Sequence, residues 1–300
     1  MSAITGQKQI TEHPMEKARS GDLSGMEVYG LDHSPWVQAV LLGLYDKNNS
    51  YALTTAPTLT LFNRQGIMMP AARMKGEKWQ YESADILGTL GYGEVSSQDM
   101  KQVGNAWQGV MHRADNPFRF FNNFSYSRDT NPSVIVRLKN HFLRSFAVLY
   151  FFLLITFGKR TRMQTDPSSF GDQFLFWEDR LEQSSGAYIN GDEPGSLDFL
   201  LFGVIQCHCS IEVPPLSSLL IDTRLKRIRV WIATMHERFS DYEHLYSSQY
   251  FEPKGTGPKA TTFVERMSFW LGTSVMLLFF PITVPAIIFL AVRVRRKQSS

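Results

Sequence analysis

The chain has few cysteines, little excess charge and no internal repeat. Only Cys207 and Cys209 are cysteines among its 300 residues, so a disulfide framework is excluded and a reducing compartment is indicated. The formal net charge of +3 gives no reason to expect a nucleic-acid partner. Residues 1–25 hold no apolar stretch of the kind a secretory signal requires, and we expect them to form a disordered lead.

The two cysteines flank His208, but this triplet does not predict a metal site. Residues two apart on a helix point to different sides, and the chain has no second cysteine pair to complete a tetrahedral ligand set. We therefore expect two buried thiols in a core helix and no metal ligand.

After the lead, short strands alternate with helices. Strands are expected at residues 26–30 and 51–54. Between them, apolar residues recur at helical spacing, with Ser34 as the N-cap and Pro35 in the first helical position.

A second group of short elements follows. Residues 73–80 predict a hairpin that turns at Lys75-Gly76, and Ser83 is expected to cap a short helix at residues 85–90. The order of strand, helix, strand, loop, two strands and helix is that of a thioredoxin-like α/β domain.

From residue 97 onward the pattern is helical. We expect helices at residues 142–157, 172–182, 197–210 and 224–239, with Gly195 or Ser196 capping the third and Asp222 the fourth. Residues 116–132 predict an extended insertion. The fold class is thus a thioredoxin-like α/β domain followed by an all-α bundle. The expected divisions are a lead (1–25), the thioredoxin-like domain (26–93), the helical domain (97–251), a linker (252–267), a membrane segment (268–293) and a basic tail (294–300).

Four motifs, in this order, make residues 26–250 resemble the glutathione transferase family. They are Ser34-Pro35-Trp36-Val37, Met69-Pro70, Glu82-Ser83 before Ala84-Asp85-Ile86-Leu87, and Gly191-Asp192-Glu193-Pro194 before Asp198. The resemblance implies glutathione as co-substrate, bound on the first domain, and an apolar electrophile held against the second. Members of this family often form homodimers, so a homodimer is the assembly that the resemblance implies.

Ser34 is the candidate catalytic residue. A hydroxyl at the start of a helix can donate a hydrogen bond to the sulfur of a bound thiol, and together with the helix dipole it favours the thiolate. The alternative is that Ser34 only caps its helix. Tyr29 offers a second hydroxyl, for which simple packing is the alternative. Because the helix begins with a serine and not a cysteine, a thiol-disulfide reductase is not expected.

Two further motifs are the candidate glutathione-binding residues. A cis Met69-Pro70 bond would expose the backbone of Met69 for pairing with the cysteinyl backbone of glutathione, the alternative being a trans proline on an edge strand. Ser83 and the free N–H groups of its helix suit the γ-glutamyl carboxylate, and Glu82 suits its ammonium group. The alternative for this pair is a capped helix with a solvated glutamate.

The chain departs from the family at two places. Many members carry Arg where Gln38 stands, and many carry a Lys or His near the position before Met69 for the glycyl carboxylate. These departures suit a rival function, a non-catalytic binding or assembly module tethered to a membrane.

A charge-free run of 24 residues, 269–292, precedes Arg293-Val294-Arg295-Arg296-Lys297. It is long enough to cross a bilayer, and Pro281 and Pro285 allow either a kinked span or a re-entrant hairpin. A buried soluble helix is the alternative. We therefore expect a membrane-anchored, glutathione-transferase-like protein whose main domain faces the cytoplasm, which binds glutathione and conjugates it to apolar electrophiles.

Overall fold

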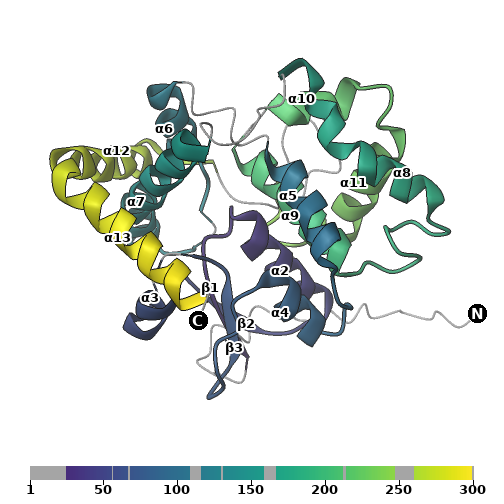
Figure 1. The fold of residues 1–300 in the computed structure, drawn as a ribbon, viewed down its shortest axis with the longest axis horizontal. Coiled ribbons are helices and arrows are strands. Elements are labelled where there is room, and N and C mark those ends of the chain that lie inside the picture. Colours follow the sequence, from purple (N-terminus) through teal and green to yellow (C-terminus); the bar gives the residue numbers. More distant parts are fainter. Residues whose placement is uncertain are drawn as a thin grey trace, which may run out of the picture.

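A small mixed sheet with three helices forms the first part of the molecule (Figure 1). The computed structural model describes residues 25–55, 57–66, 68–108, 116–129, 131–158, 167–211, 214–246 and 260–298. The first elements are β1 (Met26–Tyr29), α2 (Pro35–Asp46), β2 (Tyr51–Thr54), α3 (Leu59–Gln65), β3 (Ala71–Met74) and α4 (Ser83–Thr89).

The sheet has the order β2-β1-β3. Strand β2 runs parallel to β1, with Met26 opposite Tyr51, and β3 runs antiparallel to β1, with Met26 opposite Met74. The expected hairpin is present as a bridge between Ala72 and Gln80. This sheet order and the helix α2 between the two parallel strands confirm the predicted thioredoxin-like α/β arrangement.

Two details of this domain differ from the prediction. The segment expected to be a loop contains α3, whose N-cap Thr58 accepts a hydrogen bond from the backbone N–H of Leu61. The N-cap of α4 is Glu82, and Ser83, which was expected to cap that helix, is its first residue. A seven-residue helix between a Thr and a Gly is too short for apolar periodicity to reveal.

The second part of the molecule is helical, as predicted. Its elements are α5 (Ser97–Trp107), α6 (Pro117–Ser125), α7 (Val134–Gly158), the 3₁₀ helix η2 (Pro167–Phe174), α8 (Leu175–Gln183), α9 (Ser196–Ser210), α10 (Pro214–Ile221), α11 (Lys226–Arg238), α12 (Phe263–Leu278) and α13 (Phe280–Gln298). The insertion expected to be extended contains α6, which Asn116 caps by accepting from the N–H of Arg119. Residues 1–24 and 247–259, which include most of the expected lead and part of the expected linker, lie outside the described residues.

Buried carboxylates satisfy the ends of two helices in this part. Asp198 accepts hydrogen bonds from the N–H groups of Gly195 (3.0 Å) and Ile189 (3.0 Å) and from the indole of Trp231 (2.8 Å). Glu178 of α8 accepts from the first N–H groups of α11 at 2.8 and 2.9 Å. Asp222 was predicted to cap that helix, but its carboxylate binds Arg224 in the preceding turn.

Helices α2 and α9 pack so closely that the two parts share one hydrophobic core. A Cβ atom on Gly203 of α9 would lie 2.2 Å from the carbonyl oxygen of Pro35, so a residue without a side chain is required at this crossing. Both helices are buried over most of their length. The thioredoxin-like domain therefore could not keep its present core without the helical one.

The apolar run near the C-terminus is divided between two helices. Helix α12 packs along α7, and α13 follows after a bend of 88°. Among the described residues, no single helix is both long and apolar enough to cross a membrane. By length and composition alone, two bent pairs pass that test together: Phe263–Leu278 with Phe280–Ala286, and Ser196–Ser210 with Pro215–Ile221.

We expect Asp198→Ala to lower the free energy of unfolding by about 3 kcal/mol or more, because each buried donor left without a partner costs about 1–3 kcal/mol. Urea unfolding followed by circular dichroism measures the change. Asp179, an exposed carboxylate on α8, supplies the matched control, and Asp179→Ala should stay within about 0.5 kcal/mol of the parent. Equal urea midpoints for the two variants would contradict the role of Asp198.

Candidate functional site

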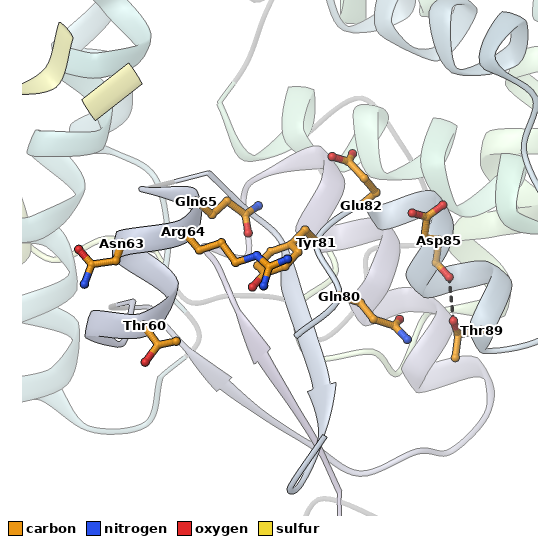
Figure 2. Close-up of a pocket in the computed structure, with 9 residues that line it drawn as sticks. All are labelled: Thr60, Asn63, Arg64, Gln65, Gln80, Tyr81, Glu82, Asp85 and Thr89. Atoms are coloured by element: carbon orange, nitrogen blue, oxygen red, sulfur yellow. Dashed lines mark hydrogen bonds between the residues drawn. The ribbon is translucent and has the colours of Figure 1, made fainter. Parts of the chain in front are cut away.

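An open cavity of about 1030 Å³ lies in the thioredoxin-like domain, between α3 and α4 (Figure 2). Helix α3 contributes Thr60, Asn63, Arg64 and Gln65, helix α4 contributes Asp85 and Thr89, and the segment between β3 and α4 contributes Gln80, Tyr81 and Glu82. The lining therefore comes from three neighbouring segments of one domain. Most of these side chains are polar and several are charged.

The charges in this cavity are of both signs. The guanidinium of Arg64 lies 5.0 Å from the ring centroid of Tyr81, a cation–π contact that holds the cation at one side of the cavity. Glu82 and Asp85 place two carboxylates at the α4 side (Figure 2). A ligand with separated positive and negative groups matches this distribution.

Gln65 connects the cavity to the predicted proline motif. Its side-chain amide donates to the carbonyl oxygen of Pro70 at 3.4 Å. Its own amide oxygen is buried and accepts no hydrogen bond from the described residues. Because this oxygen has almost no accessible surface, a ligand in the cavity does not reach it, and only the rest of the Gln65 side chain contributes to the cavity wall.

Of the predicted binding residues, only Glu82 lines the cavity. The Met69-Pro70 peptide bond is cis, as predicted. Pro70 does not line the cavity itself but is hydrogen-bonded to Gln65, which does. Ser83 is buried, at 4% exposed. The structure thus brings Glu82 together with Arg64 and Gln65, two residues that the sequence reasoning missed.

Ser34 lies elsewhere. It is 7% exposed, is not among the residues that line the cavity, and makes no side-chain capping bond although it is the N-cap of α2. The loop before it contacts the proline motif through the backbone N–H of Leu31, which donates to the sulfur of Met69 at 3.3 Å. Met69-Pro70 therefore contacts both the Ser34 loop and, through Gln65, the cavity.

A cluster of buried polar groups lies at the start of α2 and includes two residues of the loop before Ser34; we name it the junction cluster. It consists of Asp32, His33, His141, Arg144 and His244. Asp32 accepts from the hydroxyl of Tyr246 (2.9 Å) and lies 3.6 Å from His244. The ring of His33 meets that of Phe124 edge-on at 6.3 Å. The cluster joins the first domain to the helical domain around the start of α2.

The junction cluster sets unusual protonation states. Burial, reinforced by Arg144, lowers the pKa of both His33 and His141 to about 3. Burial would also lower the pKa of His244, but Asp32 and Glu243 outweigh it and raise this pKa to about 9. Burial acts against the charged form of Asp32 too, yet His244 leads the interactions that lower its pKa. A charged Asp32–His244 pair beside neutral His33 and His141 follows.

Arg144 is the buried cation of this cluster. It donates to the carbonyl oxygens of Ser127 (2.6 Å) and Arg128 (3.2 Å) and pairs with Asp129 at 3.6 Å. The side chain is fully buried. These two carbonyl oxygens and one carboxylate hold the terminal nitrogens of Arg144 at the junction, while its Nε is buried without a partner among the described residues.

The remaining candidates occupy ordinary core positions. Tyr29 packs with Leu61 and Ala71, and burial raises the pKa of its hydroxyl to about 12, so it stays protonated at neutral pH. Cys207 and Cys209 are buried in α9. Within the described residues there is no group of three His, Cys, Asp or Glu side chains placed to hold a metal ion.

No protein-family model and no curated protein matches this chain. Among solved structures it is similar to a glutathione transferase family member from Pseudomonas fluorescens with two glutathione bound (13% identity, 75% of this chain, 94% of that chain, TM-score 0.46). It is also similar to a theta class glutathione S-transferase from Xanthomonas axonopodis pv. citri with glutathione bound (15% identity, 72% and 94%, TM-score 0.39). A third similar structure is a glutathione transferase from Populus trichocarpa (16% identity, 73% and 94%, TM-score 0.39). At these identities and TM-scores the neighbours establish no residue role in this chain.

We expect stability to be greatest near pH 6.5. His33 and His141 stay neutral in the folded protein, whereas the unfolded chain takes up protons at its ordinary pKa of 6.5, so stability is lost as the pH falls from 6.5 toward about 3. His244 holds a proton that the unfolded chain releases, so stability also falls between pH 6.5 and about 9. Urea midpoints measured between pH 3 and pH 9 test both the acidic and the alkaline loss of stability.

The variant His244→Gln separates the loss of stability at high pH from the loss at low pH. The variant lacks the histidine whose pKa is raised, so the loss of stability above pH 6.5 should become smaller. The loss of stability below pH 6.5, which comes from His33 and His141, should remain. If His244→Gln loses as much stability above pH 6.5 as the parent does, the Asp32–His244 pair does not hold a proton in the folded protein.

Proposed function

We propose that this chain is a glutathione-transferase-like protein that binds glutathione in the cavity between α3 and α4. The observation that carries the proposal is the position of Glu82, which belongs to the family-like Glu82-Ser83 motif. It lies at the wall of a polar cavity, and Gln65, another wall residue, is hydrogen-bonded to the carbonyl oxygen of Pro70. The volume of about 1030 Å³ is ample for a tripeptide.

The charge distribution supports a γ-glutamyl peptide as the ligand. The carboxylates of Glu82 and Asp85 suit its α-ammonium group, and the guanidinium of Arg64 suits its glycyl carboxylate. The sequence before Met69 lacks the Lys or His that many family members use for that carboxylate, and Arg64, brought to the cavity by α3, supplies the missing positive charge.

We also propose that the protein is attached to a membrane through its C-terminal segment, with the glutathione-binding domain facing the cytoplasm. The charge-free run of residues 269–292 and the basic cluster after it support the attachment. The reduced state expected of the two cysteines and the glutathione ligand support the cytoplasmic side. Apolar electrophiles dissolved in the lipid would then be the second substrates.

A second function is a glutathione-binding module without catalysis. The burial of Ser34 and its absence from the cavity wall favour it, because a catalytic hydroxyl must reach the sulfur of the bound thiol.

We expect glutathione binding to the full-length protein to weaken at least about tenfold in Glu82→Gln, since a charge-assisted hydrogen bond contributes about 1.5–3 kcal/mol. Titration calorimetry measures the dissociation constant. Glu77, an exposed carboxylate in the hairpin turn outside the cavity, provides the matched control, and Glu77→Gln should bind as the parent does. A folded parent protein that binds no glutathione would remove the proposal altogether.

We expect Ser34→Ala to leave glutathione affinity within about twofold of the parent, because Ser34 contributes nothing to the cavity wall and its loss costs no capping bond. Conjugation to a chloronitrobenzene then separates the two functions. If the protein is a non-catalytic module, neither the parent nor Ser34→Ala will conjugate glutathione faster than the uncatalysed reaction does. A parent rate that falls about a hundredfold or more in Ser34→Ala would identify Ser34 as catalytic and exclude the module.

A further inference from the structure

Helix α12 is buried on one face and exposes apolar residues on the opposite face. At about 100° per residue, its buried residues Glu265, Phe269, Gly272, Thr273 and Met276 fall on one side. A second set falls on the other side, and we call it the outer stripe: Phe263, Val264, Met267, Leu271 and Leu278, each 52–75% exposed. An outward face of a soluble helix is ordinarily polar, so the outer stripe needs an apolar partner.

The inner face of α12 is fixed to α7. Gly272 lies so close that an added Cβ would be 2.5 Å from the carbonyl oxygen of Phe142. The hydroxyl of Ser268 donates to the carbonyl oxygen of Leu138 at 2.8 Å. At the start of the helix, the carboxylate of Glu265 pairs with Arg137 of α7. Helix α12 is therefore a member of the helical domain and is not surrounded by lipid on all sides.

Helix α13 continues the exposed apolar surface. After the 88° bend, Ile282, Ile288 and Phe289 are 47–68% exposed. The apolar part of α13, residues 280–292, is about 20 Å long at 1.5 Å per residue, whereas the hydrocarbon core of a bilayer is about 30 Å thick. Neither helix is thus suited to cross a bilayer alone.

The charged residues that follow Glu265 in the sequence are all positive. After Glu265 the sequence contains no Asp or Glu, but it contains Arg266, Arg293, Arg295, Arg296 and Lys297. Exposed apolar residues with basic residues at the margin match a bilayer that carries anionic headgroups. So many exposed large apolar residues on two consecutive helices are uncommon on a protein without a partner.

We infer that the outer stripe of α12 and the apolar residues of α13 form an in-plane docking surface for an anionic lipid bilayer. The helices enter one leaflet to a depth of about 5–10 Å, and the basic end of α13 meets the headgroups. This inference rests on the membrane attachment proposed above and specifies its mode, docking on one leaflet without a span.

The docking mode has a consequence for the cavity. Helix α13 contacts α3, and Figure 1 places these two helices on the same side of the sheet. Helix α3 supplies Arg64 and Gln65 to the cavity wall. The glutathione site is therefore beside the docking surface, where an apolar compound leaving the leaflet reaches it by a short path.

Flotation of the full-length protein with phosphatidylserine-containing vesicles and with phosphatidylcholine vesicles tests the inference. The paired change Leu271→Glu with Leu278→Glu places two charges on the outer stripe, and we expect it to lower vesicle affinity at least about tenfold. The matched control is Ile221→Glu with Val230→Glu, two exposed apolar residues on α10 and α11 (77% and 63% exposed), which should float as the parent does. Thermal melts verify that all variants fold.

Two further measurements define the mode. Replacing Arg293, Arg295, Arg296 and Lys297 by Gln should weaken binding to phosphatidylserine vesicles by more than about tenfold and should abolish the difference between the two lipid compositions. An alkaline carbonate wash should release the parent protein from the vesicles, because a docked protein is extracted and a spanning one is not.

Each contrary result overturns the inference in a distinct way. Parent-like flotation of the outer-stripe variant, or retention after the carbonate wash, would leave membrane attachment intact but exclude docking through this face. A change from dimer to monomer in the outer-stripe variant, measured by light scattering, would show that a second copy covers the stripe. A parent protein that floats with neither lipid would remove membrane attachment too, while glutathione binding, measured by calorimetry, is decided separately.

Discussion

The close crossing of α2 and α9 is the contact on which the rest of the structure depends. With Gly203 against the backbone of Pro35, the first helix of the thioredoxin-like domain is buried in the helical domain instead of lying at its surface. One hydrophobic core then serves both parts. The loop that precedes α2 is consequently held inside the junction, and every polar group on that loop needs a partner from the helical domain.

The junction cluster follows from that burial. Asp32 cannot keep its charge in the interior without a cation, and His244 supplies one. The side-chain amide of Gln38 donates to the carbonyl oxygen of His244 at 3.1 Å, so Gln38 supports the junction from α2. The same packing that stabilises the start of α2 encloses Ser34, and it separates this hydroxyl from the cavity that Glu82 lines.

The sequence predicted the elements whose signals are local and repeated. Strands β1 and β2, the Pro35 start of α2 and the cis Met69-Pro70 bond agree with the structure. Helix α3 was missed because its seven residues are too few for periodicity, although Thr58 and Gly66 mark its ends. Arg64 and Gln65 were missed with it. The cap of α11 was assigned to Asp222, but Glu178 provides it from a residue 49 positions earlier, and a partner that distant has no local signal.

The C-terminal run shows a different limit of sequence reasoning. Hydropathy counts apolar residues without regard to what covers them, so a helix between a protein and a bilayer scores like a helix surrounded by lipid. In α12 the inner face is buried, with Gly272 and Ser268 against the backbone of α7. On the opposite face Leu271 and Leu278 are exposed. A helix with one buried face and one exposed apolar face is what two different partners would require. The distribution of burial around α12, and not its mean hydropathy, is therefore the observation that separates the docking proposed here from a span.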